Sequence, residues 1–144
     1  MERAQPGPGA TTQQGRAGGP RGPAPGRPPE SPTGLSVTVR TQPGGVVVAL
    51  DGELDHGTVG QLSPVLEGIR VLGADRVILD CARLNFFDSS GLRVLLRGRR
   101  LAEAEGGSLE LAAPQPMLEL TLRLTGTWDL FPVHRTLEDA WLDG

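Results

Sequence analysis

The distribution of apolar positions divides the chain into two parts near residue 34. Residues 1–34 contain no Val, Ile, Leu, Phe or Trp, whereas Val and Leu recur throughout the rest of the chain. A segment without large apolar side chains cannot bury enough surface to offset the conformational entropy that ordering would remove. We therefore expect residues 1–34 to form a disordered Gly/Pro-rich tail and residues 35–144 to form one globular domain.

Short apolar runs in the second part predict β-strands. Residues 35–39 alternate apolar and polar side chains, which is typical of a half-buried strand. Residues 46–50 are nearly all apolar, as in a strand covered on both faces. The Pro43-Gly44-Gly45 turn between them predicts a hairpin. Further strands are predicted at residues 76–80, 108–112 and 131–133, the last at a sheet edge because it contains a proline.

Apolar residues spaced three and four apart predict four helices. The first carries Val59, Leu62, Val65, Leu66, Ile69 and Leu72. Its start is open: Thr58 and Gln61 fit a capping box, whereas Pro64 favours a later start with Ser63 as the cap. The second helix carries Leu92, Leu95, Leu96 and Leu101 and ends at a Gly-Gly pair; the third covers residues 116–124; Thr136 caps the last.

This alternation defines an α/β fold. The order β-β-α-β-α-β-α-β-α predicts a mixed sheet of four to five strands with about four helices, an antiparallel entry and right-handed crossovers.

Charge and cysteine content exclude several classes of function. The formal net charge is −3 and becomes about −5 for the domain, because the tail contributes +2, so nucleic acid is not an expected partner. Cys81 is the only cysteine, which excludes an internal disulfide and a cysteine-based metal cluster. No apolar run approaches the length of a membrane span, and no signal peptide is recognisable. We expect a soluble, cytoplasmic protein.

Two short motifs resemble those of a known family. Residues 52–55 read Gly-Glu-Leu-Asp and are followed by Thr58, and residues 85–92 read Asn-Phe-Phe-Asp-Ser-Ser-Gly-Leu. In this order, with one helix and one strand between them, they resemble the sulfate transporter and anti-sigma factor antagonist (STAS) domain. The resemblance covers residues 35–144. Arg93 and Gly98 depart from the family pattern.

The resemblance implies a phosphorylation-controlled binding protein and not an enzyme. Ser89 would accept phosphate from an anti-sigma factor serine kinase; the dephosphorylated domain would bind that kinase and release a sigma factor. A serine phosphatase would reset the switch. ATP would belong to the kinase, so this chain needs no cofactor. The partner-binding residues implied are Leu54, Asp55, Thr58, Asp88, Ser89, Ser90 and Gly91.

The residues themselves leave simpler roles open. Asp88, Ser89 or Ser90 can cap the second helix, a common role for such residues at a helix start. Asp55 can bond its own backbone in a turn, and Leu54 can belong to the core. The same fold could also serve as a scaffold or transporter-partner subunit without phosphorylation, and the oligomeric state is open.

Catalysis and metal binding have little support. Ser89 with His56 or His134 could nominally form a triad, but no Gly-x-Ser-x-Gly elbow is present. Two histidines and one cysteine show no metal-ligand spacing. We predict no catalytic and no metal-binding residues.

Overall fold

The computed structural model describes residues 34–71, 73 and 75–142. The elements, in chain order, are β1 (Leu35–Gln42), β2 (Gly45–Leu54), α1 (Val59–Val71), β3 (Arg76–Phe87), α2 (Ser89–Ala104), β4 (Ser108–Ala112), α3 (Pro116–Leu124), the 3₁₀ turn η1 (Trp128–Leu130), β5 (Val133–His134) and α4 (Leu137–Leu142). The predicted α/β order is confirmed. The predicted disordered tail lies outside the described residues, Gly34 apart.

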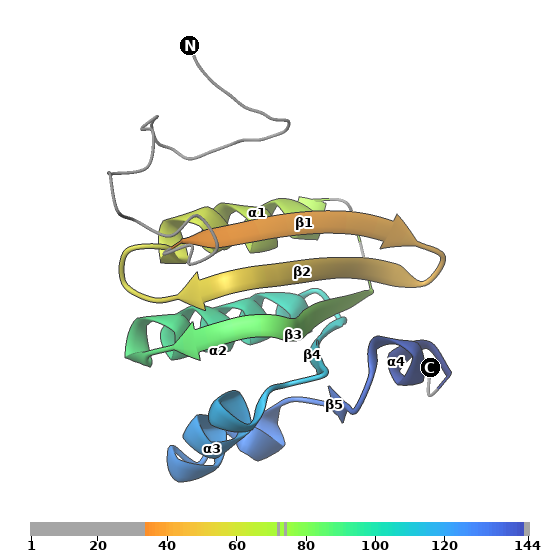
Figure 1. Ribbon diagram of the computed structural model, residues 1–144. Helices are drawn as coiled ribbons and strands as arrows, with labels where there is room; N and C mark the ends of the chain where they lie inside the picture. The colour runs from red at the N-terminus through yellow and green to blue at the C-terminus, as the bar shows by residue number, and fades with distance from the viewer. Residues whose placement is uncertain (1–33, 72, 74, 143–144) are drawn as a thin grey trace. The chain divides into compact units, whose positions relative to one another are not determined.

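The five strands form one mixed sheet in the order β1-β2-β3-β4-β5 (Figure 1). β1 and β2 are antiparallel and form the predicted hairpin, with Leu35 opposite Gly52 and Gln42 opposite Gly45. All other neighbouring strands are parallel. β2 and β3 therefore end at the same edge of the sheet, where their arrowheads lie side by side in Figure 1.

β2 and β3 are longer than their apolar runs predicted. Their pairing continues to Leu54 and Phe87, with register shifts between Ala49 and Asp51 and between Gly52 and Glu53. β3 thus extends well beyond the predicted strand 76–80, because β2 supplies backbone partners beyond the end of β4. These irregularities break the period of two by which a strand is recognised.

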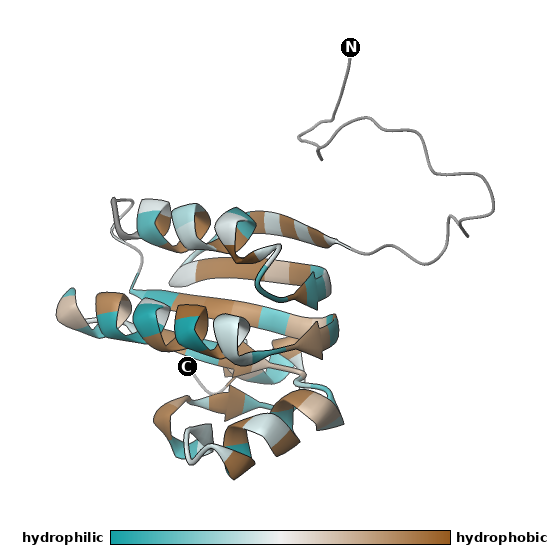
Figure 2. Cartoon of the chain, turned by 90° about the vertical axis from the view of Figure 1, so that its left-hand side faces the viewer, coloured by the Kyte–Doolittle hydropathy of each residue, from teal (hydrophilic) through white to brown (hydrophobic). Residues whose placement is uncertain are grey.

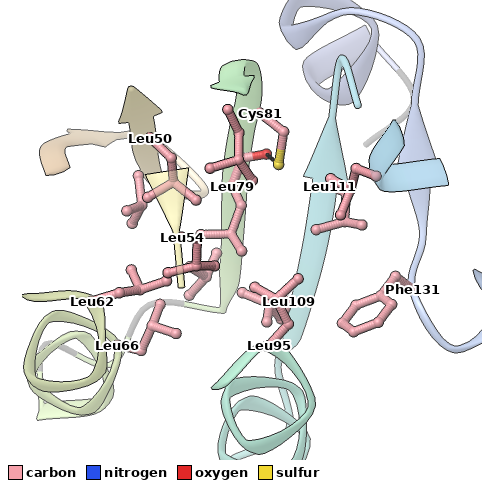
Figure 3. Packing of buried hydrophobic residues seen from close by; sticks show 14 of the residues in the cluster. Leu50, Leu54, Leu62, Leu66, Leu79, Cys81, Leu95, Leu109, Leu111 and Phe131 are labelled. Atoms are coloured by element: carbon pink, nitrogen blue, oxygen red, sulfur yellow. Dashed lines mark hydrogen bonds between the residues drawn. The ribbon is translucent and has the colours of Figure 1, made fainter. Parts of the chain in front are cut away.

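Helices α1, α2 and α3 share one face of the sheet. Their buried leucines join one apolar cluster with residues of β2, β3 and β4. In Figure 3 the side chains of Leu54, Leu62, Leu66, Leu95 and Leu109 converge between the sheet and two helices. Figure 2 shows apolar positions along the strands and alternating with hydrophilic ones around the helices.

Gly98 explains how closely α1 and α2 pack. A Cβ atom at this position would lie 2.9 Å from Leu66 Cδ1 and 3.2 Å from Leu109 Cδ2. Glycine weakens a helix by about 1 kcal/mol relative to alanine. Here it removes the side chain that would separate α2 from α1 and β4.

α1 begins at Val59 with Pro64 inside it, so the later start at Pro64 with a Ser63 cap is wrong. The capping box is not formed as predicted either. Thr58 Oγ1 donates to the Glu53 carbonyl at 2.7 Å, and the Gln61 amide donates to the Leu35 carbonyl at 3.2 Å. Both side chains bond to the preceding strands instead of closing the start of the helix.

The opposite face of the sheet is covered near β4 and β5 by α4. Ala140 packs with Ile78 and Ala112 in a second apolar cluster. The predicted Thr136 cap is confirmed, because its hydroxyl accepts the Asp139 N–H at 3.0 Å. No helix in the described ranges is long and apolar enough to cross a membrane.

Candidate functional site

The two sequence motifs meet at the edge where β2 and β3 end. Leu54 pairs with Phe87 in the parallel ladder, so the residues that follow them leave the sheet side by side. Asp88 donates its backbone N–H to the Leu54 carbonyl at 3.3 Å. The β2–α1 loop and the start of α2 therefore form one surface, which we call the switch surface: residues 55–58 and residues 86–90.

Asp88 is the cap of α2. Its Oδ1 accepts the Gly91 N–H at 3.0 Å, and its backbone is extended. Its Oδ2 accepts the His56 N–H at 3.2 Å, which connects the helix start to the β2–α1 loop. Of the three residues that could have capped the helix, Asp88 does so.

Ser89 is therefore free of a structural role in the cap. It is the first residue of α2 and its side chain is exposed. Within the described ranges no hydrogen bond to its hydroxyl occurs. The backbone N–H groups and positive dipole end at a helix start favour negative charge. Ser90, the next residue, is half-buried.

Asp55 organises the facing loop as an aspartate turn. Its Oδ1 accepts the N–H groups of Gly57 at 2.9 Å and Thr58 at 3.1 Å. Thr58 Oγ1 accepts the Asp55 N–H at 2.9 Å, so each of the two residues accepts a backbone hydrogen bond from the other and the turn is fixed. The turn role that the sequence left open for Asp55 is present, and its partly exposed side chain still borders the switch surface.

Three of the predicted partner-binding residues are buried. Leu54 is 0% exposed, Thr58 is 8% exposed and Gly91 is also buried. A Cβ at Gly91 would lie 2.9 Å from the Leu54 carbonyl oxygen, so the glycine permits α2 to approach β2. Direct contact of these three residues with a partner does not fit their burial; they support the switch surface from below.

Phe86 was missed as a surface residue. Its side chain is 42% exposed, whereas the adjacent Phe87 is buried. Neighbouring residues in a strand point to opposite faces, so the Phe-Phe pair alone indicated that one ring would leave the core. Phe86 therefore presents an exposed aromatic ring on β3, three residues before Ser89 in the sequence.

A second polar cluster connects β3, β4 and β5. Glu110 accepts hydrogen bonds from Arg76 Nε at 2.9 Å, from the Ser108 hydroxyl at 2.6 Å and bonds to His134 Nε2 at 2.8 Å. Burial alone would raise the pKa of Glu110, but these hydrogen bonds and the Arg76 charge outweigh it and lower the pKa to about 2. Arg76 also donates to the Ala140 carbonyl at 2.8 Å, which attaches α4 to the sheet.

The two histidines and the cysteine lie in different surroundings. His134 is buried and bonds to Glu110, so it has a structural partner within the sheet. His56 is exposed and meets Asp88 through its backbone N–H. Cys81 is a buried free thiol, and burial followed by the charge of Asp80 raises its pKa to about 12. Among the described residues, no three His, Cys, Asp or Glu side chains are grouped to hold a metal ion.

Comparison with known proteins identifies the family to which this fold belongs. Residues 36–140 match the model of the STAS domain, and the chain belongs to that family. It is 29% identical over 101 residues to the anti-sigma F factor antagonist of Paenibacillus polymyxa, covering 69% of this chain and 86% of that protein.

Two solved structures show the same fold. The anti-sigma factor antagonist SpoIIAA in its unphosphorylated form is 30% identical, with a TM-score of 0.64 over 73% of this chain and 92% of that one. The Bacillus cell fate determinant SpoIIAA in the phosphorylated form is 29% identical, with a TM-score of 0.62 over 75% and 98%.

Proposed function

We propose that this chain is an anti-sigma factor antagonist controlled by phosphorylation of Ser89. In its dephosphorylated form it binds an anti-sigma factor serine kinase, and a sigma factor is released. Phosphorylation dissociates the complex and a serine phosphatase restores the binding form. The observation that carries this proposal is that two neighbouring residues have separate roles at the start of α2. Asp88 caps the helix, while the Ser89 side chain is exposed and its hydroxyl makes no hydrogen bond within the described ranges.

The relatives support the same reading. Several similar proteins are named anti-sigma factor antagonists, and SpoIIAA has been solved in unphosphorylated and phosphorylated forms. ATP is the substrate of the partner kinase, so no cofactor is assigned to this chain. A protein with this role would act in the cytoplasm.

Phosphate at Ser89 would change the switch surface without unfolding the domain. It adds a charge of about −1.5 to −2 to a helix start that favours anions. The same charge lies next to Asp88 and faces the loop of Asp55, on a surface that must lose water when a partner binds. Repulsion and desolvation therefore oppose binding, and about 1.4 kcal/mol is enough for a tenfold loss of affinity.

The partner is expected to contact the exposed side chains of the switch surface. These are Phe86, His56 and Ser89, with Asp55, Asp88 and Ser90 partly accessible. An aromatic ring surrounded by polar groups is a common arrangement at the centre of a protein interface. The buried Leu54, Thr58 and Gly91 hold this arrangement.

The decisive experiment combines the full chain with candidate anti-sigma factor kinases and ATP and measures intact mass. The parent should gain one phosphate, Ser89→Ala none, and the matched variant Ser90→Ala one. If Ser89→Ala gained phosphate as readily as the parent, another residue would be the phosphoacceptor. If no kinase binds either form, the result favours the alternative of a scaffold or transporter-partner subunit of the same fold.

A phosphate-mimicking variant tests the consequence for binding. Ser89→Glu should weaken binding to the kinase at least several-fold while its melting temperature stays within a few degrees of the parent, because the side chain lies outside the core. A collapse of the fold would show that Ser89 has a structural role instead.

A further inference from the structure

We infer that Arg93 is an internal receptor for the phosphate on Ser89, a role that rests on the proposed phosphorylation of that serine. Ser89 and Arg93 lie four residues apart in α2, and both side chains are exposed. Residues with this spacing stand one above the other on the same side of a helix. A phosphate on Ser89 is therefore within reach of the Arg93 guanidinium.

Arg93 is poorly placed in the unmodified helix. The first turn of α2 contains no acidic residue, and the carboxylate at the helix start, that of Asp88, already accepts the Gly91 and His56 N–H groups. The residues one turn away are Ser89, Ser90, Leu96 and Arg97. None is a carboxylate, and Arg97 repels Arg93 at a spacing where like charges are destabilising.

Other arginines of α2 already have acidic neighbours. Arg97 Nη2 lies 3.5 Å from Glu67 Oε2, and Arg99 Nε lies 3.2 Å from Glu103 Oε2. In the described ranges Arg93 has no such carboxylate partner. A side chain that breaks local rules without compensation often serves a function.

Phosphorylation of Ser89 would supply the acidic partner that Arg93 lacks within α2. It places negative charge at the start of the helix, where the dipole favours it. It also creates an acidic group four residues before a basic one, the better order for a helical ion pair. The planar guanidinium can donate two hydrogen bonds to phosphate oxygens.

The surroundings of the phosphate make this contact selective. Asp88 precedes Ser89, and the facing loop presents Asp55 and His56. The carboxylates repel a phosphate, so Arg93 draws it along α2 and away from the loop. Phosphorylation then alters two exposed side chains. Ser89 acquires negative charge, and the Arg93 guanidinium, once paired with the phosphate, is no longer available to bind a partner protein.

The test uses phosphoserine inserted at position 89 during translation, so that it does not depend on any kinase. The second phosphate pKa, ordinarily about 6, is followed by ³¹P NMR in the full chain and in Arg93→Gln. We expect this pKa to be about 0.4 units lower with Arg93 present. Arg93→Lys should retain part of the shift.

Arg100→Gln is the matched control. Arg100 is exposed on the same helix, eleven residues from Ser89 and therefore on nearly the same side, but about 16 Å further along the axis. The control should leave the phosphate pKa within about 0.1 units of the parent. Circular dichroism of each variant establishes that the fold is intact.

Equal phosphate pKa values with Arg93 and with Gln at position 93 would overturn the inference, and so would an equal shift from Arg100→Gln, which would show a general charge effect. These results are separate from the proposed function. Failure of every kinase to modify Ser89 would refute the function and leave the measured pairing unchanged.

Discussion

The backbone N–H of His56 donates to Asp88 Oδ2 at 3.2 Å, although the two residues are 32 positions apart in the chain. The same carboxylate accepts the Gly91 N–H through its other oxygen. One side chain thus caps α2 and fixes the β2–α1 loop against it. The shape of the switch surface depends on this aspartate, whereas its charge state would depend on the serine beside it.

Removal of the Asp88 carboxylate should therefore affect both loops. Asp88→Ala is expected to destabilise the domain by about 1 kcal/mol, in the range for a lost helix cap, because the Gly91 and His56 N–H groups lose their acceptor. Asp88→Asn keeps a cap oxygen and should lose less. Urea unfolding measures the difference. Equal stability of parent and Asp88→Ala would mean that neither hydrogen bond contributes.

Glu110 should give the domain a measurable acid sensitivity. Its pKa is lowered from 4.5 to about 2 in the folded protein, so its contribution is fully present above about pH 5 and is lost as the pH falls toward 2. Near neutral pH, the lowered pKa of Glu110 adds about 3 kcal/mol to the free energy of unfolding.

The comparison with Glu110→Gln isolates this group from the other carboxylates. The variant should be less stable than the parent at pH 7, and the gap should shrink as the pH falls to 2, because the parent carboxylate becomes protonated. Urea midpoints measured across this range test the expectation. A gap that stays constant would mean that Glu110 titrates alike in the folded and unfolded chains.

Cys81 should report global unfolding through its reactivity. The thiol is buried and its pKa is raised to about 12, so little thiolate forms at neutral pH. A thiol reagent should label the native chain slowly and the urea-unfolded chain rapidly. Ser89→Ala provides a matched background in which the rate should not change. Rapid labelling of the native protein would contradict the burial of Cys81.

Gly98 should tolerate only very small side chains. Gly98→Val places branched carbons against Leu66 and Leu109 and is expected to destabilise the domain by about 1 to 3 kcal/mol. Gly98→Ala should cost less, because helix propensity gains about 1 kcal/mol while the Leu66 methyl group can move. Gly68, which has open space at its Cβ position in α1, serves as control. Gly68→Ala should not destabilise.

The sequence predicted most elements of the fold because its strong patterns are local. The β1–β2 hairpin follows from two short strand patterns on either side of Pro43-Gly44-Gly45, and α3 begins and ends where its proline and glycine signals lie. The far ends of β2 and β3 escaped prediction, because they depend on irregular pairing between strands distant in the chain. The start of α1 was not predicted for a related reason, because the side chains of Thr58 and Gln61 bond to strands β2 and β1 and do not cap the helix.

The candidate site was located by its motifs, but the separate roles of its residues required the structure. Asp88, Ser89 and Ser90 are all good capping residues, and their spacing alone cannot say which one bonds to Gly91. In the same way, only the structure shows that Leu54 and Thr58 are buried while the Asp55 side chain is partly exposed. These distinctions arise from the meeting of two loops that lie about thirty residues apart.

Because the carboxylate of Asp88 carries the helix start, selection on folding places little constraint on the residue after it. If Ser89 is the phosphoacceptor that we propose, a substitution at this position would remove the regulatory input and leave the architecture intact. Descendant proteins could then lose or regain control by phosphate through single substitutions, without passing through an unstable ancestor.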